Sequence, residues 1–255
     1  MTTWLPLESN PDVLNKYLEK LGVSPLWNIV DIYSMDDDAL AFVPSPLKSL
    51  IFLFPCSDVY EEFRAKEDAE LKAKNIEHPK DLFYLRQYVH NACGTIALVH
   101  AVLNNPDIEL TEGSVMKKYL DGARDLSPEE RGKLLENDAG FTETHESVAN
   151  EGQTAAPDIN EKVYHHFVAF VHHGGKLYEL DGRKNFRPDQ IVPKNSNERK
   201  LLLSIIISSS WMPLLLQSKA QLLPVVFSSC FFLAQEECVK MIGFGDCVIL
   251  LPETR

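Results

Sequence analysis

The sequence predicts a mixed α/β (α+β) protein, for three reasons. Several segments carry apolar residues at helical spacing, and some of them begin at capping residues. Short apolar runs between these segments are typical of buried strands. Two such runs flank a Gly-bearing turn within residues 165–182, which indicates an antiparallel hairpin. The 255 residues are enough for a sizeable core in one large domain or two small ones.

A first helix is predicted after Asn10, a favoured N-cap residue followed by Pro11 at the first helical position. Gly22 is expected to end this helix. Residues 27–33 and the continuous apolar run at 50–54 follow as predicted strands. The apolar face of the first helix consists of Leu14, Tyr17 or Leu18, and Leu21.

Four more helices are predicted before residue 137, one of which begins near Cys93 and is described below. Residues 58–76 are charged and helix-forming, and residues 114–120 form a second candidate. Ser127, followed by Pro128 and by Glu130 three positions later, is a capping box that starts a short helix ending near residue 136. The inward positions expected in the first of these helices are Val59, Phe63 and Leu71.

Residues 137–162, from Asn137 to Lys162, are predicted to form a long loop. They lack apolar periodicity and are rich in Gly, Thr, Asn, Glu and Pro. Loops longer than about 12–15 residues are uncommon in compact domains and are usually functional or disordered.

The chain is acidic, with 25 Lys and Arg against 37 Asp and Glu and a net charge of −12. Residues 196–255 hold five of each sign, so the first 195 residues carry the whole net charge. This charge argues against nucleic acid and favours a partner with a basic surface, unless acidity only aids solubility.

The cysteine pattern indicates a reduced, intracellular protein. The number of cysteines is odd, no CxxC motif occurs, and no apolar signal-peptide region follows Met1. A cytoplasmic location is therefore predicted. The cysteines are Cys56, Cys93, Cys230, Cys238 and Cys247.

Cys93 stands where a turn is predicted to become a helix. Asn91 is a favoured N-cap residue, which predicts that Cys93 lies in the first helical turn. A helix N-terminus carries a partial positive charge and unpaired N–H groups, and both favour a thiolate. The alternative is a buried cysteine that acts as a small hydrophobic residue. The apolar residues that predict the helix are Ile96, Val99, Val102 and Leu103.

The hairpin is predicted to hold His166 and Asp181 on one face. A turn at residues 173–174 would place the two directly opposite each other, and a turn at 174–175 would place them diagonally. In both registers they share a face, because side chains alternate along a strand and paired residues point the same way.

A cysteine at a helix start, with a histidine held by an aspartate, is the arrangement of a thiol nucleophile, its base and an orienting group. The adjacent histidines could also indicate a metal site. However, His165 points to the opposite face from His166, and no cysteine or carboxylate set completes a site, so no metal is predicted.

Taken together, these segments resemble the ubiquitin carboxyl-terminal hydrolase (UCH) family of cysteine peptidases, specifically its short single-domain isozymes, through residue 193. The nucleophile segment reads QYVHNACGT at 87–95. The hairpin reads HFVAFVH at 166–172 and LYELDGRK at 177–184. Further similar segments are WLPLESNP at 4–11, THE at 144–146 and EGQTAAP at 151–157.

The resemblance implies a papain-like fold, knotted in the family, with a central, mostly antiparallel sheet and helices on both sides. Residues 1–195 would form the catalytic domain, and residues 196–255 a divergent apolar tail. Cys93 would be the nucleophile, and His166 the general base and later the acid. Asp181 would orient the imidazole, and Gln87 would donate a hydrogen bond to the oxyanion. Substrate contacts are implied for Pro6, Leu7 and the loop at 137–162, which in this family crosses over the active site.

The implied reaction is hydrolysis after the C-terminal glycine of ubiquitin, through a thioester and without a cofactor. The crossing loop would pass only small or unfolded adducts. The implied partner is ubiquitin, and ubiquitin-like proteins are a second candidate. Ubiquitin's tail carries arginines that suit an acidic surface. The protein would act as a monomer.

After Pro193 the resemblance stops, and residues 201–218 and 220–235 carry no charged side chain. Three interpretations are open. The tail is an alternative C-terminus without an evolved role, or it folds as buried structure with residues 246–251 standing in for the family's closing strand. In the third, it contacts a membrane, although 18 uncharged residues are near the lower limit for a span and are interrupted by proline and serines.

The tail also raises an alternative function. Without a closing strand, an unpaired sheet edge would favour aggregation and loosen the His–Asp geometry. The chain would then be a ubiquitin-binding protein that no longer cleaves. All four catalytic positions are filled, which favours the enzyme.

Overall fold

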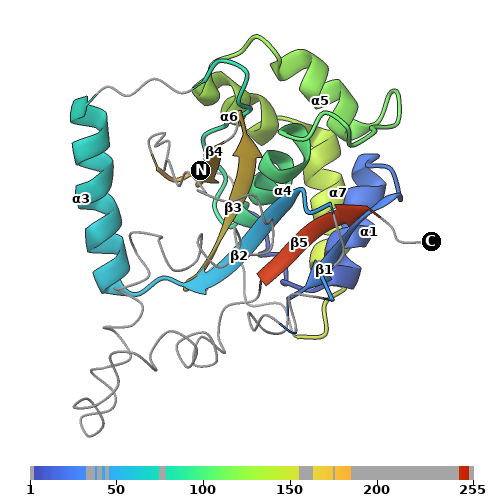
Figure 1. Cartoon of the computed structure of the whole chain (residues 1–255), viewed down its shortest axis with the longest axis horizontal. Coiled ribbons are helices and arrows are strands. Elements are labelled where there is room, and N and C mark those ends of the chain that lie inside the picture. The colour runs from blue at the N-terminus through green and yellow to red at the C-terminus, as the bar shows by residue number, and fades with distance from the viewer. Residues whose placement is uncertain are drawn as a thin grey trace, which may run out of the picture.

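A five-stranded sheet runs through the centre of the protein in the order β1-β5-β2-β3-β4 (Figure 1). Every neighbouring pair of strands is antiparallel, which confirms the predicted antiparallel character of the sheet. The strands are β1 (Trp27–Asp31), β2 (Ser49–Pro55), β3 (His165–His173), β4 (Lys176–Leu180) and β5 (Cys247–Pro252). The computed structural model describes residues 3–32, 38, 42–43, 46–74, 79–154, 163–174, 176–184 and 247–252.

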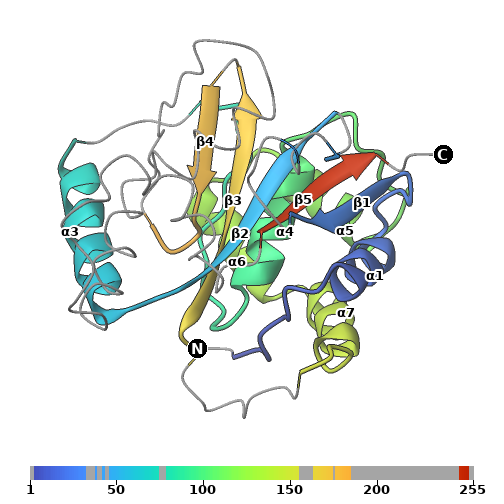
Figure 2. The same cartoon turned by 60° about the horizontal axis from the view of Figure 1, so that its bottom comes forward.

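Helix α4 lies at the centre of the helical layer and packs on β2 and β3 (Figure 2). Its residues 94–102 are all buried, as expected for a helix that is apolar all round. Among the described residues, no helix is long and apolar enough to cross a membrane. The helices are α1 (Pro11–Leu21), α3 (Asp58–Lys74), α4 (Cys93–Leu103), α5 (Val115–Ala123), α6 (Pro128–Glu136) and α7 (Ala139–Ala149).

The capping signals predicted for α1 and α6 define the ends of these helices as expected. The side chain of Asn10 accepts a hydrogen bond from the backbone N–H of Asp12 at the start of α1, and Gly22 ends the helix at φ 90°. At the start of α6, the hydroxyl of Ser127 accepts from the N–H of Glu130, and the Glu130 carboxylate accepts in return from the N–H of Ser127.

The predicted loop at residues 137–162 is wrong over its first half, where α7 forms. Asp138 caps this helix by accepting from the N–H of Phe141. The buried residues of α7 are spaced as on one face of a helix. One of them is His145, a polar residue that a search for apolar periodicity does not include in the core. The buried set is Phe141, His145, Val148 and Ala149. Residues 155–162 of the predicted loop lie outside the described residues.

His145 belongs in the core because both of its ring nitrogens are hydrogen-bonded. Nε2 lies 2.6 Å from the carbonyl oxygen of Leu5, which can only accept, so Nε2 carries the proton. Nδ1 then accepts from the hydroxyl of Thr95 at 2.9 Å. Burial lowers the pKa of His145 to about 4, so the ring is neutral. Helix α7 is thereby tied to α4 two residues after Cys93.

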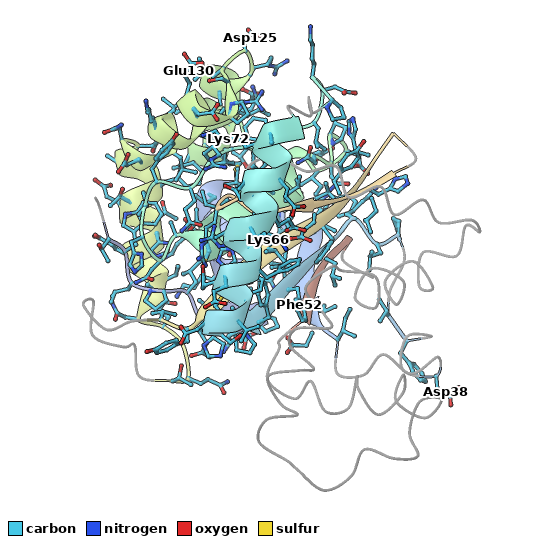
Figure 3. The ribbon with its side chains drawn as sticks, turned by 90° about the vertical axis from the view of Figure 1, so that its left-hand side faces the viewer. Asp38, Phe52, Lys66, Lys72, Asp125 and Glu130 are labelled. Atoms are coloured by element: carbon cyan, nitrogen blue, oxygen red, sulfur yellow. The ribbon has the colours of Figure 1, made fainter. Side chains whose placement is uncertain are left out.

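Helix α3 stands apart from the other helices, and Figure 3 looks onto its outer side, where Lys66 and Lys72 lie. The prediction that Val59 points inward is wrong, since it is 40% exposed. Tyr60 and Glu67 are the buried positions instead, and Phe63 is half-buried. The buried face contains a carboxylate, so apolar periodicity could not identify it. The side chain of the other expected inward residue, Leu71, lies outside the described part.

Strand β5 pairs with β1 on one side and with β2 on the other. The second of the three interpretations of the tail expected a strand at residues 246–251, and this part of it is confirmed. Burial of the remaining tail stays a prediction. Residues 185–246 lie outside the described part of the chain.

The hairpin adopts the second of the two predicted registers. His173 pairs with Lys176, so the turn lies at residues 174–175, and Gly174 has a φ of 55°, a value that favours glycine. His166 and Asp181 therefore lie diagonally on one face of the sheet.

Candidate active site

A cavity of about 400 Å³ opens where α4 begins beside β3. Three of the four predicted catalytic residues, Cys93, His166 and Gln87, line it. Asp181 lies behind His166 and is 3% exposed. The acidic residues at this cavity are Asp58 and Glu61, both from the first turn of α3.

Cys93 is the first residue of α4, as predicted, but Asn91 is not the N-cap. The N-cap residue is Ala92, which makes no side-chain cap hydrogen bond. Asn91 takes a left-handed conformation at φ 61°, which asparagine tolerates better than most residues. Its side chain donates to the carbonyl of Trp4 at 3.2 Å. Cys93 therefore belongs to the first turn of α4, whose backbone N–H groups have no partner within the helix.

His166 is held between Cys93 and Asp181. Its Nε2 lies 2.8 Å from Oδ1 of Asp181, and the ring is 2% exposed. Since Nε2 is taken by the carboxylate, Nδ1 is the ring nitrogen left for the hydrogen bond with the Cys93 thiol. Phe54, the β2 partner of His166, meets the imidazole edge-on and limits its rotation.

The three groups shift one another's proton affinity. Burial opposes ionisation of Cys93, but the hydrogen bond and positive charge of His166 bring the thiol pKa below its ordinary value. Burial would likewise lower the pKa of His166, yet the charge and hydrogen bond of Asp181, with Cys93 adding to them, raise it to about 9. Burial also opposes the charge of Asp181, while His166 holds the pKa of this carboxyl well below its usual range. The site therefore favours a thiolate–imidazolium pair at neutral pH.

This pair predicts a specific pH dependence. Because the pKa of Cys93 is lowered and that of His166 is raised, the ion pair exists between the two values. Alkylation of Cys93 by iodoacetamide should persist well below pH 8.5, near the pKa of a free thiol. Hydrolysis should decline above about pH 9, where His166 loses its proton.

Cys56 provides the internal comparison for this measurement. It lines the same cavity, but burial raises the pKa of its thiol to about 12. Alkylation rates of both cysteines can be followed against pH by peptide mass spectrometry. A Cys93 rate that follows an ordinary thiol titration would contradict the ion pair.

Gln87 lies across the cavity and is tied to the loop that carries Asp181. Its backbone N–H donates to the carbonyl of Gly182 at 2.9 Å. Gly182 allows this close approach, because a Cβ there would lie 3.1 Å from the Cβ of Gln87. The side-chain Nε2 donates one hydrogen to the carbonyl of Val89 at 2.9 Å. An amide nitrogen carries two hydrogens, so Nε2 can donate a second hydrogen bond.

Replacing Gln87 with alanine is expected to lower kcat by about 10²- to 10³-fold with a small change in KM, as is typical for loss of one oxyanion donor. Steady-state kinetics on a fluorogenic ubiquitin substrate measure both constants. A kcat within threefold of the unmodified protein would show that Gln87 does not serve the oxyanion.

Two basic residues after Asp181 also support the site, and their roles were not predicted. The backbone N–H of Arg183 donates to Oδ1 of Asp181 at 2.8 Å, and its guanidinium pairs with Glu61 of α3 at 2.5 Å. The Lys184 ammonium is buried between Glu179 at 2.7 Å and Glu67 at 3.2 Å. Glu179 lies two residues before Asp181, so the two side chains point to the same face. A charged residue at this position of an otherwise apolar strand was the sequence feature that could have indicated an ion pair.

Replacing Lys184 with methionine should lower the free energy of unfolding by about 3–5 kcal/mol, because two buried carboxylates lose their counter-charge. Urea unfolding followed by circular dichroism measures the loss. Adding Glu67→Gln should recover part of this loss, since one of the two carboxylates that pair with Lys184 is then replaced by a neutral amide. A loss in the free energy of unfolding below about 1 kcal/mol would contradict a structural role for the ion pairs of Lys184 with Glu67 and Glu179.

The predicted substrate contacts are only partly accessible. Leu7 is 5% exposed and packs against Gly94, next to Cys93, while Pro6 is half-buried. Glu8, the residue after Leu7, is hydrogen-bonded to the segment that follows α7. Its carboxylate accepts from the N–H of Gln153 at 3.2 Å and from the N–H and hydroxyl of Thr154 at 2.9 and 2.6 Å.

Comparison with known proteins identifies the family. The family model for ubiquitin carboxyl-terminal hydrolase, family 1, matches residues 4–207. A ubiquitin carboxyl-terminal hydrolase of Drosophila melanogaster is 54% identical over 186 residues, which cover 73% of this chain and 81% of the fly protein. Ubiquitin carboxyl-terminal hydrolase isozyme L1 of Rattus norvegicus is 43% identical over 182 residues, or 71% and 79% of the two chains.

A solved structure shares the fold. The catalytic domain of Trichinella spiralis UCH37, bound to ubiquitin vinyl methyl ester, matches with a TM-score of 0.59 at 19% identity. The match covers 98% of this chain and 96% of that domain. With a family model that spans most of its length and relatives of this similarity, the chain belongs to ubiquitin carboxyl-terminal hydrolase family 1.

Proposed function

We propose that this protein is a cysteine-dependent deubiquitinating hydrolase that releases small or unfolded adducts from the C-terminal glycine of ubiquitin. The observation that carries the proposal is the alignment of Cys93, His166 and Asp181 at one end of a cavity, in a chain of this family. Two relatives of this chain, from Drosophila melanogaster and Rattus norvegicus, are named ubiquitin carboxyl-terminal hydrolases.

In the first half of the reaction, the Cys93 thiolate attacks the carbonyl carbon of the terminal glycine. The tetrahedral oxyanion accepts hydrogen bonds from the Gln87 amide and from the backbone N–H of Cys93 at the start of α4. The His166 imidazolium gives its proton to the leaving amine as the C–N bond breaks. This leaves ubiquitin joined to the sulfur as a thioester.

In the second half, neutral His166 removes a proton from water, and the resulting hydroxide attacks the thioester carbonyl. The C–S bond breaks, and Cys93 returns as a thiolate beside the protonated imidazole. Ubiquitin leaves with a free terminal carboxyl group, which loses its proton to solvent at neutral pH. Asp181 supports the ring in both halves by accepting from Nε2 at 2.8 Å.

One feature of the cavity supports a substrate with a basic tail. The preference for small or unfolded adducts follows from the family resemblance, through a crossing loop whose residues 155–162 lie outside the described part of the chain. Asp58 is an exposed acid at the cavity, and with the net charge of −12 it should speed association with an arginine-bearing tail.

We further propose that the protein acts in the cytoplasm. The two cysteines whose side chains the structure describes, Cys56 and Cys93, are free thiols, which suits a reducing compartment. The premise of the alternative, a ubiquitin binder disabled by a missing strand, loses its basis because β5 lies between β1 and β2.

Covalent capture tests the proposal. The full-length protein is incubated with ubiquitin vinyl methyl ester, and the product is weighed by intact-mass spectrometry. We expect one ubiquitin per chain, attached at Cys93 in the peptide map. Ubiquitin binding without an adduct would favour the non-cleaving alternative, and an adduct at Cys56 would overturn the assigned nucleophile.

A further inference from the structure

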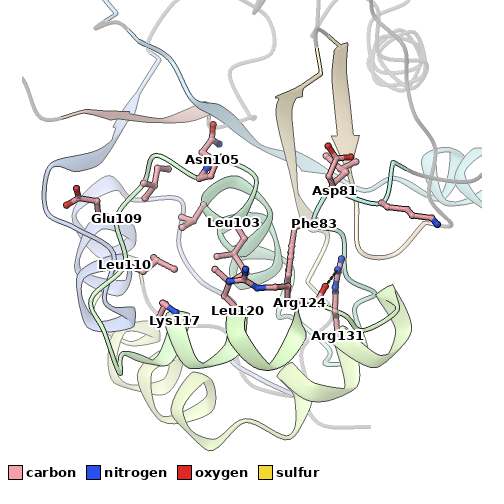
Figure 4. Close-up of a pocket in the computed structure, with 15 residues that line it drawn as sticks. Asp81, Phe83, Leu103, Asn105, Glu109, Leu110, Lys117, Leu120, Arg124 and Arg131 are labelled. Carbon is pink, nitrogen blue, oxygen red and sulfur yellow. Dashed lines mark hydrogen bonds between the residues drawn. The ribbon is translucent and has the colours of Figure 1, made fainter.

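A second cavity, of about 670 Å³, opens at the other end of α4 from Cys93 (Figure 4). An 11-residue helix is about 16 Å long, so the two cavities lie at opposite ends of the same buried element. They share no lining residue. The proposed hydrolysis makes no use of this second cavity.

The body of the cavity is apolar. Leu103 at the end of α4, Leu110 in the following loop and Leu120 on α5 are only partly buried and face the same space (Figure 4). The buried side chains of Phe83 and Val102 line it as well. Its volume lies within the range of small-molecule sites, about 300–1,000 Å³.

The charged lining is mainly basic, in contrast to the acidic chain as a whole. Four cations line the cavity against two carboxylates, those of Asp81 and Glu109. Asp81 is itself 3.0 Å from Nε2 of His173. The cations are Lys80, Lys117, Arg124 and Arg131.

The cations of this cavity differ in how far they are neutralised. Lys117 lies 2.5 Å from a carboxylate oxygen of Asp121 and 3.9 Å from one of Glu112, and Arg124 lies 3.5 Å from the same Asp121 carboxylate. Arg131 is 6% exposed, and its guanidinium lies over the ring of Phe83. It donates to carbonyl oxygens at the end of α5, and no carboxylate of the described chain lies within ion-pair distance. The helix-end carbonyls offset only part of this charge.

We propose that this cavity binds a small amphipathic anion, with an apolar body over the three leucines and an acidic head group towards Lys117, Arg124 and Arg131. The apolar body gains from leaving water, and the head group supplies a negative charge near Arg131, the one of these three cations that has no ion pair among the described residues. The ligand class is that of a medium-chain carboxylate. A neutral molecule of the same shape gains only the apolar part of this interaction.

The test uses decanoate and its neutral counterpart 1-decanol on the full-length protein. Both are titrated in competition with the fluorescent sulfonate 8-anilinonaphthalene-1-sulfonate. We expect saturable binding of one decanoate per chain, at least about tenfold tighter than 1-decanol, as for a hydrogen bond to a charged group. Equal affinities for the two would overturn the proposal, as would the absence of saturable binding.

Two variants locate the site. Arg124→Glu reverses a charge at an exposed position on the rim, and should weaken decanoate binding at least about tenfold. Lys118→Glu makes the same charge change on an exposed residue of the same helix that does not line the cavity, and should change binding less than about twofold. Equal effects from both variants, or none from Arg124→Glu, would place the ligand elsewhere and overturn the assignment.

Discussion

Replacing Cys93 with alanine is expected to lower kcat/KM for a fluorogenic ubiquitin substrate by about 10⁶-fold, the scale of losing the nucleophile of a catalytic triad. The reason is chemical, because the thioester cannot form without the sulfur. Ubiquitin binding should persist, since the side chain is small and half-buried at the start of α4. Stopped-flow or long-time turnover assays and calorimetric titration with ubiquitin measure the two properties.

Cys56→Ser is the matched control for this variant. Cys56 lines the same cavity, but burial raises the pKa of its thiol to about 12, so it remains protonated at neutral pH. Its substitution should change turnover by no more than a few-fold. Retained turnover in Cys93→Ala, or a comparable loss in Cys56→Ser, would contradict the assignment of the nucleophile.

Asp181→Asn is expected to lower kcat by up to about 10⁴-fold, as observed when the orienting carboxylate of a triad becomes an amide. The amide keeps the shape of the side chain but removes its charge, so the pKa of His166 should fall from about 9. Less imidazolium is then present at neutral pH to stabilise the Cys93 thiolate. Alkylation of Cys93 should accordingly move towards the pH dependence of an ordinary thiol.

Asp125→Asn, the same change on an exposed residue far along the chain from the site, is the control. It should leave both kcat and the alkylation profile unchanged. If Asp181→Asn reduces kcat but the alkylation profile of Cys93 does not move, then the carboxylate acts by holding the ring in place and not through its charge. A kcat near that of the unmodified protein would contradict both roles.

Local signals in the sequence predicted much of the fold. Asn10, Pro11 and the capping box at Ser127 specify helix starts through hydrogen bonds made within a few residues, so no distant contact is needed. The same holds for the hairpin. Strand alternation alone places His166 and Asp181 on one face in either register.

Helix α7 could not be predicted in this way. Its buried His145 counts as polar in a sequence pattern and becomes a core residue only through hydrogen bonds to Thr95 and to the carbonyl of Leu5. Those partners lie 50 and 140 positions away. The inward face of α3 was missed for a similar reason, because its buried Glu67 pairs with Lys184.

The sequence by itself therefore determined the types of most helices and strands, the chemical groups of the site and the common face of His166 and Asp181, because these depend on near neighbours. Only the tertiary structure decided the turn at residues 174–175 and the place of β5 between β1 and β2. It also decided that Cys93 meets an imidazole 73 positions later in the chain. These features depend on the packing of segments distant in sequence, where many arrangements satisfy the local pattern and burial and hydrogen bonding select one.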